Sequence, residues 1–139
     1  MITSAALDPL MLVDTSVWID YLNGYASPQA DCLAQALSED TPILLCGVVL
    51  TEILLGLPTP EVRWLEPLLD AFSLAPELER NDYSAAAQIY RTCRQNGVTI
   101  RSTIDCLIAQ ICLKHNFPLL AKDRDFVHIA RFFPLQLYS

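Results

Sequence analysis

Basic residues are missing from the first sixty positions of this 139-residue sequence, although seven acidic residues occur there. The net charge of −7 therefore comes entirely from this part, because acidic and basic residues balance in the remainder. Such a charge repels polyanions and favours either a basic partner or bound divalent cations. The seven acidic residues are Asp8, Asp14, Asp20, Asp31, Glu39, Asp40 and Glu52.

Long hydrophobic runs and a basic N-terminal segment are also missing. No apolar stretch approaches the roughly eighteen residues that a membrane-spanning helix requires. Residues 1–10 lack the basic start of a signal peptide. We therefore expect a cytoplasmic protein that does not associate with membranes.

Cysteine and histidine do not form metal-binding patterns. The five cysteines include no Cys-x-x-Cys pair and lie among apolar neighbours, which is typical of buried free thiols in a reducing compartment. The two histidines, His115 and His128, are isolated and are expected at the surface. Any metal site in this chain should consist of oxygen ligands.

Short apolar runs alternate with amphipathic segments along most of the sequence. The composition, 53% hydrophobic and 18% charged, is typical of one globular domain, which we assign to residues 1–139 with 1–10 as an extension. The alternation predicts a three-layer α/β/α fold with a mainly parallel central sheet of four to five strands. Expected strands are 11–13, 43–46, 73–75 and 119–121. Expected helices are 15–22, 28–37, 48–55, 59–72, 83–95, 102–116 and 126–131.

Capping residues mark several of the expected helix ends. Gly24 is expected to end the first helix, and Ser27 is expected to cap the second. Asn81 is expected to cap the helix that follows it. Ser102 and Asp105 have the spacing of a capping box, with Asp in place of the usual Glu or Gln.

Asp14 stands directly after the first apolar run and before two hydroxyl residues. This pattern predicts a carboxylate at the carboxyl end of a strand, on the edge where open α/β sheets bind ligands. A helix-capping role is an equally good interpretation of this stretch alone, because Asp is a common N-cap residue.

Glu52 is the only charged residue between Asp40 and Glu61, within an otherwise apolar helix. A carboxylate is rarely left in such surroundings without a partner. We expect Glu52 to face an aqueous cleft that holds a cation. Two alternatives are a buried pairing with an arginine and a helix that exposes this one face.

Two further acidic positions lie at element ends in the second half of the chain. Asp105 lies one turn into a helix, where a purely capping role is the alternative to a functional one. Asp123 follows the last predicted strand, so it should share a sheet edge with Asp14. Asp125 comes two residues later and could contribute to the site or cap a helix.

Four carboxylates within about 4 to 6 Å repel one another by several kcal/mol in aggregate, at roughly 4 kcal/mol per close pair. A cluster of Asp14, Glu52, Asp105 and Asp123 would therefore need a cation. Oxygen ligands favour a hard ion, Mg²⁺ or Mn²⁺. Such ions clamp phosphate oxygens and activate a bound water, which is what phosphodiester hydrolysis requires.

Four segments together resemble the acidic blocks of PIN-domain nucleases, in particular the VapC-type toxins of bacterial toxin–antitoxin pairs. The segments follow the order and spacing of that family between Met11 and Phe126, although each is weakly specific alone. They read MLVDTSVWIDYL, LTEILLG, TIDCLIAQIC and LLAKDRDF.

The resemblance implies a Mg²⁺- or Mn²⁺-dependent endoribonuclease, a homodimer, and a VapB-like antitoxin whose basic C-terminal segment enters the acidic cleft. It implies that the metal-binding and catalytic residues are Asp14, Glu52, Asp105 and Asp123, supported by Ser16 and Asp125. The sequence departs from the family where a hydroxyl residue is common, at Cys46, Val49 and Ala121.

The expected reaction is in-line attack by metal-activated water on an RNA phosphate, with Glu52 binding metal or accepting the proton. RNA should be recruited by the second half of the chain, with Arg101, Lys122 and Arg124 as candidates beside Arg91 and Arg94. A solvated face is the alternative for each of these.

An alternative for the whole protein is a catalytically silent, dimeric module that binds a basic peptide. An aspartyl-phosphate hydrolase is disfavoured because Asp14-Thr15-Ser16 lacks the Asp-x-Asp pattern.

Overall fold

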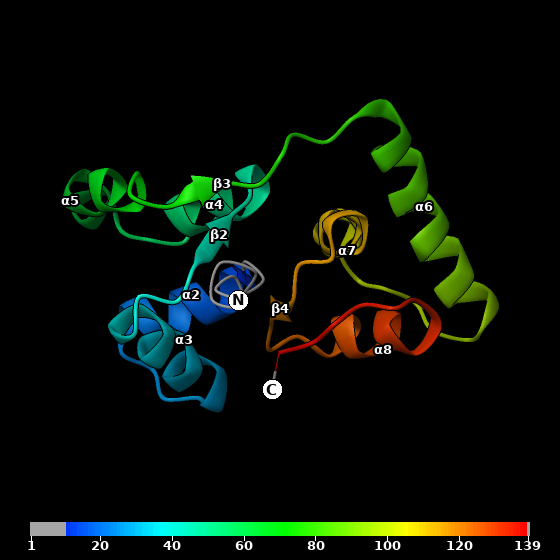
Figure 1. Ribbon diagram of the computed structural model, residues 1–139, viewed down its shortest axis with the longest axis horizontal. Helices are drawn as coiled ribbons and strands as arrows, with labels where there is room; N and C mark the ends of the chain where they lie inside the picture. The colour runs from blue at the N-terminus through cyan, green and yellow to red at the C-terminus, as the bar shows by residue number, and fades with distance from the viewer. Residues whose placement is uncertain (1–10, 139) are drawn as a thin grey trace, which may run out of the picture.

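A four-stranded parallel sheet forms the centre of the molecule, in a computed structural model that describes residues 11–138 (Figure 1). The strand order is β3-β2-β1-β4, and every neighbouring pair is parallel. The predicted α/β class with a mainly parallel sheet is confirmed. The predicted extension at 1–10 lies outside the described residues. The strands are β1 (Met11–Val13), β2 (Ile43–Leu45), β3 (Ser73–Leu74) and β4 (Leu119–Leu120).

Helices cover both faces of this sheet. In Figure 1, α2 and α3 lie on one side of the strands and α6 and α7 on the other. Helix α2 packs on α3 and α4, whereas α6 packs on α7 and α8. The helices are α2 (Thr15–Asn23), α3 (Pro28–Ser38), α4 (Gly47–Leu55), α5 (Thr59–Leu69), α6 (Arg80–Gln95), α7 (Thr103–His115) and α8 (Arg124–Phe132).

The chain reverses its direction across the sheet between β3 and β4. It moves outward from β1 to β2 to β3, and then returns to add β4 on the free side of β1. Since crossovers between parallel strands are right-handed, this reversal places the later helices on the opposite face. Ligands bind at such a switch point, outside the carboxyl ends of the two strands. Here those strands are β1 and β4.

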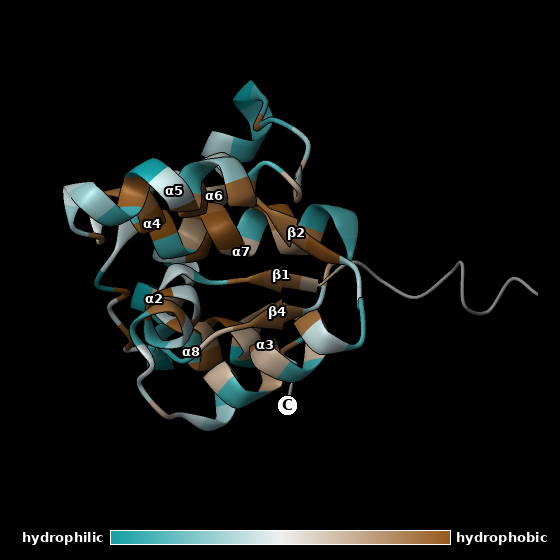
Figure 2. Cartoon of the chain, turned by 90° about the vertical axis from the view of Figure 1, so that its left-hand side faces the viewer, coloured by the Kyte–Doolittle hydropathy of each residue, from teal (hydrophilic) through white to brown (hydrophobic). Residues whose placement is uncertain are grey.

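Apolar strands fit this burial on both faces. Every residue of β1, β2 and β4 is buried, and Figure 2 shows these strands as apolar along their length. Trp18 of α2 adds an edge-to-face contact with Phe72, with ring centroids 5.4 Å apart. Continuous apolar runs are expected in parallel strands that are covered on both sides. None of the helices within residues 11–138 combines the length and apolar character needed to cross a bilayer.

Two of the predicted helix ends are confirmed. The side chain of Ser27 accepts a hydrogen bond from the backbone N–H of Ala30 at 3.0 Å, with Pro28 in the first turn of α3. Gly24 ends α2 with a φ of 73°, the left-handed conformation that glycine adopts without strain.

The predicted start of α6 is wrong. The N-cap is Glu79, not Asn81, and a capping box joins Glu79 to Asp82. The carboxylate of Asp82 accepts the Glu79 N–H at 2.8 Å and also contacts Lys114 of α7 at 3.0 Å and Gln110 at 3.2 Å. A contact to a distant helix fixes this end, and no local pattern in the sequence indicates that contact.

Protonation of Asp82 at low pH should lower the stability of the fold. Its hydrogen bond from the Glu79 N–H, followed by those from Lys114 and Gln110, lowers its pKa from 3.8 to about 2. Its contribution to stability is therefore present above about pH 4 and is lost as the pH falls towards about 2. We expect Asp82→Asn to lower the urea midpoint near neutral pH and to approach the wild-type midpoint near about pH 2.5. Urea titrations across this range measure the difference.

Asp70→Asn is the matched control, because Asp70 is exposed at the end of α5. Its midpoint should follow that of the wild type at each pH. A gap between Asp82→Asn and the wild type that stayed constant down to acid pH would contradict the ion-pair account.

Candidate metal centre

Asp14 stands where β1 ends and α2 begins, with only 5% of its surface exposed. Its backbone occupies the N-cap position, but its carboxylate accepts a hydrogen bond from the hydroxyl of Ser16 at 2.9 Å instead of capping the helix. Burial raises the pKa of Asp14, and the hydrogen bond from Ser16 opposes this shift. The side chain is therefore held at the sheet edge by the hydroxyl of Ser16, in the first turn of α2.

Glu52 reaches the same region from the middle of α4. The hydroxyl of Thr15 donates a hydrogen bond to Glu52 Oε1 at 2.7 Å, which joins the start of α2 to α4. The charge of Glu52 also contributes to raising the pKa of Asp14. Among residues 11–138, no arginine pairs with Glu52, so the alternative of a buried Arg–Glu pair is wrong.

Asp105 makes no capping hydrogen bond to the start of α7 among the described residues. Within the described residues, Ser102 makes no side-chain capping bond, so the predicted capping box is wrong. Asp105 is 8% exposed, and its buried Oδ2 atom has no hydrogen-bond partner in the part of the chain that the structure describes. An unpartnered buried carboxylate oxygen is costly, and a bound cation would satisfy it.

The electrostatic surroundings of Asp105 explain why its charge is disfavoured without a cation. Burial is the largest cause, and the nearby charges of Asp14, Asp123, Asp125 and Glu52 add to it. Together they raise the pKa of Asp105 from 3.8 to about 7. The other four carboxylates therefore all act on Asp105 electrostatically.

Asp123 and Asp125 complete the cluster from the start of α8. Asp123 is the N-cap residue, and its carboxylate accepts the backbone N–H of Asp125 at 2.9 Å. One oxygen each from Asp105, Asp123 and Asp125 lie within 4.8 Å of one another. This group of three contains Asp125, which the sequence predicted only as a supporting or capping residue. Asp14 and Glu52 lie outside it but act on Asp105 through their charges.

The chemistry of the donor atoms fits a hard divalent cation. Two thiols adjoin the carboxylates, but burial raises the pKa of both Cys46 and Cys106 to about 11. Both thiols are therefore neutral near pH 7. Because the thiolate is the form that binds metal, neither is a suitable ligand. Carboxylate oxygens are thus the available ligands, which favours Mg²⁺ or Mn²⁺ over Zn²⁺.

The three predicted RNA-binding residues differ in their surroundings. Arg101 forms ion pairs with Asp123 and Asp125, as described further below. Lys122 pairs with Asp20 at 2.5 Å, so its charge is already partly balanced. Arg124 is exposed in the first turn of α8. RNA binding by these residues stays a prediction.

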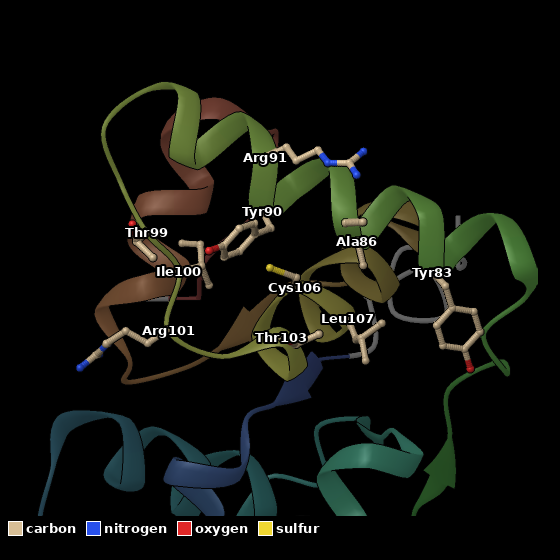
Figure 3. A pocket seen from close by; sticks show the side chains of 11 residues that line it. Tyr83, Ala86, Tyr90, Arg91, Thr99, Ile100, Arg101, Thr103, Cys106 and Leu107 are labelled. Carbon is tan, nitrogen blue, oxygen red and sulfur yellow. The ribbon is translucent and has the colours of Figure 1, made fainter.

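A groove of about 830 Å³ lies beside the acidic cluster, between α6 and α7 (Figure 3). Its walls include Tyr83, Tyr90, Ile100, Arg101 and Leu107. Arg101 belongs to both features, since it lines the groove and contacts the carboxylates. In Figure 3 its side chain points away from the apolar part of the groove.

The sequence that forms this sheet and its acidic centre matches the model of the PIN domain family over residues 11–132. The chain therefore belongs to the PIN-domain family. The predicted resemblance is confirmed.

Individual relatives place the chain near VapC-type members of that family. It is 36% identical over 132 residues to VapC ribonuclease Mb1587 of Mycobacterium bovis and to Ribonuclease VapC11 of Mycobacterium tuberculosis. The match covers 94% of this chain and 98% of each relative.

Solved structures share the fold at low sequence identity. VapBC2 from Rickettsia felis, bound to a DNA fragment from its promoter, matches with a TM-score of 0.69 and 18% identity, covering 93% of this chain and 97% of that one. FitAcB from Neisseria gonorrhoeae matches with a TM-score of 0.67 and 19% identity, covering 94% and 97%.

The metal-free protein should become more stable when Asp105 loses its charge. Because the folded pKa of Asp105 is above its ordinary value, its stabilising contribution is present at low pH and is lost as the pH rises from about 4 to about 7. We expect Asp105→Asn to raise the free energy of unfolding at about pH 8 by about 1 to 4 kcal/mol, the upper value being the full pKa difference at about 1.4 kcal/mol per pH unit. Urea denaturation in the presence of a chelator measures it.

Asp31→Asn is the control, since Asp31 is an exposed acid in the first turn of α3. It should not reproduce the gain. Added Mn²⁺ should stabilise the wild type more than Asp105→Asn. A variant no more stable than the wild type at about pH 8 without metal would contradict the proposed electrostatic repulsion.

Proposed function

We propose that this protein is a Mg²⁺- or Mn²⁺-dependent endoribonuclease that acts as the toxin of a VapBC-type toxin–antitoxin system. One observation carries the proposal: the buried, unpartnered Oδ2 of Asp105 among four other carboxylates. Membership of the PIN-domain family and the 36% identity to proteins named VapC ribonucleases support the same activity.

Asp14, Glu52, Asp105 and Asp123 are the proposed metal-binding and catalytic residues, and Asp125 is close enough to join them. A divalent ion bound there would neutralise phosphate charge and lower the pKa of the attacking water. Ser16 orients Asp14 through its hydrogen bond.

Glu52 is the proposed acceptor of the proton from the attacking water. The hydroxyl of Thr15 holds one of its carboxylate oxygens in place, and the side chain is only half-buried. A carboxylate that is oriented but accessible suits general base catalysis. The reaction class is hydrolysis of an RNA phosphodiester bond.

A basic antitoxin segment is the proposed inhibitor of this site. The first sixty residues contain no basic residue, and the carboxylates gather at one edge of the sheet. An arginine or lysine from a VapB-like partner would be attracted there and would exclude a metal ion.

The cytoplasm is the proposed compartment, because it is reducing and the five cysteines are free.

A homodimer is the proposed assembly. Several large apolar side chains are more than half exposed, and a second copy or an antitoxin would cover such surfaces. Among the described residues they are Tyr25, Leu55, Trp64, Leu68, Leu74, Tyr83 and Val127. Light scattering should give twice the chain mass of 15.5 kDa, whereas a mass of one chain at micromolar concentration would refute the dimer.

RNA cleavage should depend on the metal and on two of the acids. We expect wild-type protein to cleave structured RNA with Mg²⁺ or Mn²⁺ and to stop when a chelator is added. Asp14→Asn and Asp105→Asn should each lower the rate by about 100-fold or more, because metal catalysis contributes several kcal/mol. The measurement is the initial cleavage rate at saturating metal, with circular dichroism to confirm folding.

Asp31→Asn serves again as the matched control and should cleave at the wild-type rate. Equal cleavage by the wild type and both site variants would reject the assignment. Calorimetry separates the nuclease from the silent peptide-binding module: the nuclease binds Mn²⁺ through these acids, and a module without a metal site releases no heat of binding.

A further inference from the structure

Arg101 is the only arginine that contacts the acidic cluster within residues 11–138. Its guanidinium lies 3.2 Å from Asp123 Oδ1 and 3.5 Å from Asp125 Oδ2. These are oxygens of two of the three carboxylates that approach one another within 4.8 Å. The guanidinium therefore contacts two of the carboxylates that a divalent ion at this cluster would bind.

The backbone of Arg101 is anchored separately from its side chain. Its N–H donates to Asp125 Oδ2 at 2.9 Å, which fixes the segment before α7 to the start of α8. This bond does not depend on the guanidinium. Movement of the side chain would leave the main chain, and so the position of the carboxylates, unchanged.

The charge of Arg101 balances only part of the cluster. Asp123 and Asp125 face the guanidinium directly, whereas Asp105 Oδ2 stays buried without a partner. An ion that binds all three carboxylates would satisfy Asp105 as well, which Arg101 does not do. The cluster thus favours the divalent ion over its own arginine.

We propose that Arg101 is an exchangeable counter-ion: it neutralises Asp123 and Asp125 when metal is absent, is displaced by the divalent ion, and then binds a phosphate of the RNA. Arg101 is a positioning residue for the substrate. The part of this inference that concerns RNA rests on the proposed function, whereas the part that concerns metal does not.

Displacement costs little because the Arg101 side chain is 73% exposed. Ion pairs of exposed side chains contribute little to stability, since water screens them and their side chains lose entropy. After displacement the guanidinium stays beside the metal because its N–H remains bound to Asp125. Arginine binds phosphate through two parallel hydrogen bonds, so a backbone phosphate is the group that it would meet there.

Metal affinity without substrate tests the exchange. Mn²⁺ is titrated by calorimetry into metal-free wild type, Arg101→Gln and Arg101→Lys at neutral pH. Arg101→Gln should bind Mn²⁺ about two- to tenfold more tightly, as expected when exposed ion pairs no longer compete. Arg101→Lys keeps the charge but lacks the planar guanidinium group. Its affinity for Mn²⁺ should therefore fall between those of the wild type and the glutamine variant.

Arg63→Gln is the matched control. It removes the same charge from an exposed position on α5, and its Mn²⁺ affinity should equal that of the wild type. An Arg101→Gln variant that binds Mn²⁺ as weakly as the wild type, or more weakly, would overturn the exchange. An Arg101→Lys variant with the same Mn²⁺ affinity as the wild type would also overturn it. The tighter binding by Arg101→Gln would then be explained by the loss of a positive charge alone.

Cleavage of a single-stranded RNA oligonucleotide at saturating Mn²⁺ tests the second role. Arg101→Gln should raise KM about tenfold or more with a smaller change in kcat, as for the loss of a charged hydrogen bond. An unchanged KM would overturn phosphate binding by Arg101. If the wild type cleaves no RNA but the Mn²⁺ affinities change as expected, the nuclease proposal fails and the counter-ion exchange stands.

Discussion

The uncompensated charge of Asp105 is the constraint on which the rest of this structure depends. Its buried Oδ2 lacks a partner among the described residues, and four other carboxylates act on it. A fold that only required stability would neutralise this position, because Asn would occupy the same space without repulsion. The five acids together disfavour the charged form of Asp105, and a hard cation, as proposed here, would compensate their charge. In the proposed metal site, the same residue would link stability to metal binding.

The topology of the sheet explains why acids that are distant in sequence meet at this place. The chain leaves β1 in one direction and returns to its other side as β4, so the carboxyl ends of both strands flank one crevice. Asp14 follows β1 directly, and Asp123 lies in the short loop between β4 and α8. Helices α4 and α7 bring Glu52 and Asp105 from opposite faces of the sheet. The sheet edge and both helical layers thus contribute acids that act on Asp105, although only Asp123 and Asp125 join it in the group within 4.8 Å.

The sequence was informative where local chemistry determines structure. Apolar runs predicted the strands, and Ser27 predicted a helix start, because burial and capping are local properties. The role of Asp82 was missed, and that of Asp125 was left open between the site and a helix cap, because both depend on partners far along the chain, Lys114 for the first and Arg101 for the second. The spacing of Ser102 and Asp105 also suggested a capping box, which the described part of the structure does not contain. A pattern of residue types does not reveal the direction of a side chain. Long-range contacts decide such orientations.

The central claim is that the cluster around Asp105 is a cation site. A crystal soaked with Mn²⁺ tests it most directly, because anomalous scattering locates the ion independently of any assay. The account predicts an anomalous peak at about 2.1 Å from Asp105 Oδ2, the distance at which oxygen ligands bind such ions, shared with Asp123 or Asp125. A soaked crystal with no anomalous peak at these carboxylates, or with manganese bound only elsewhere on the molecule, would contradict it.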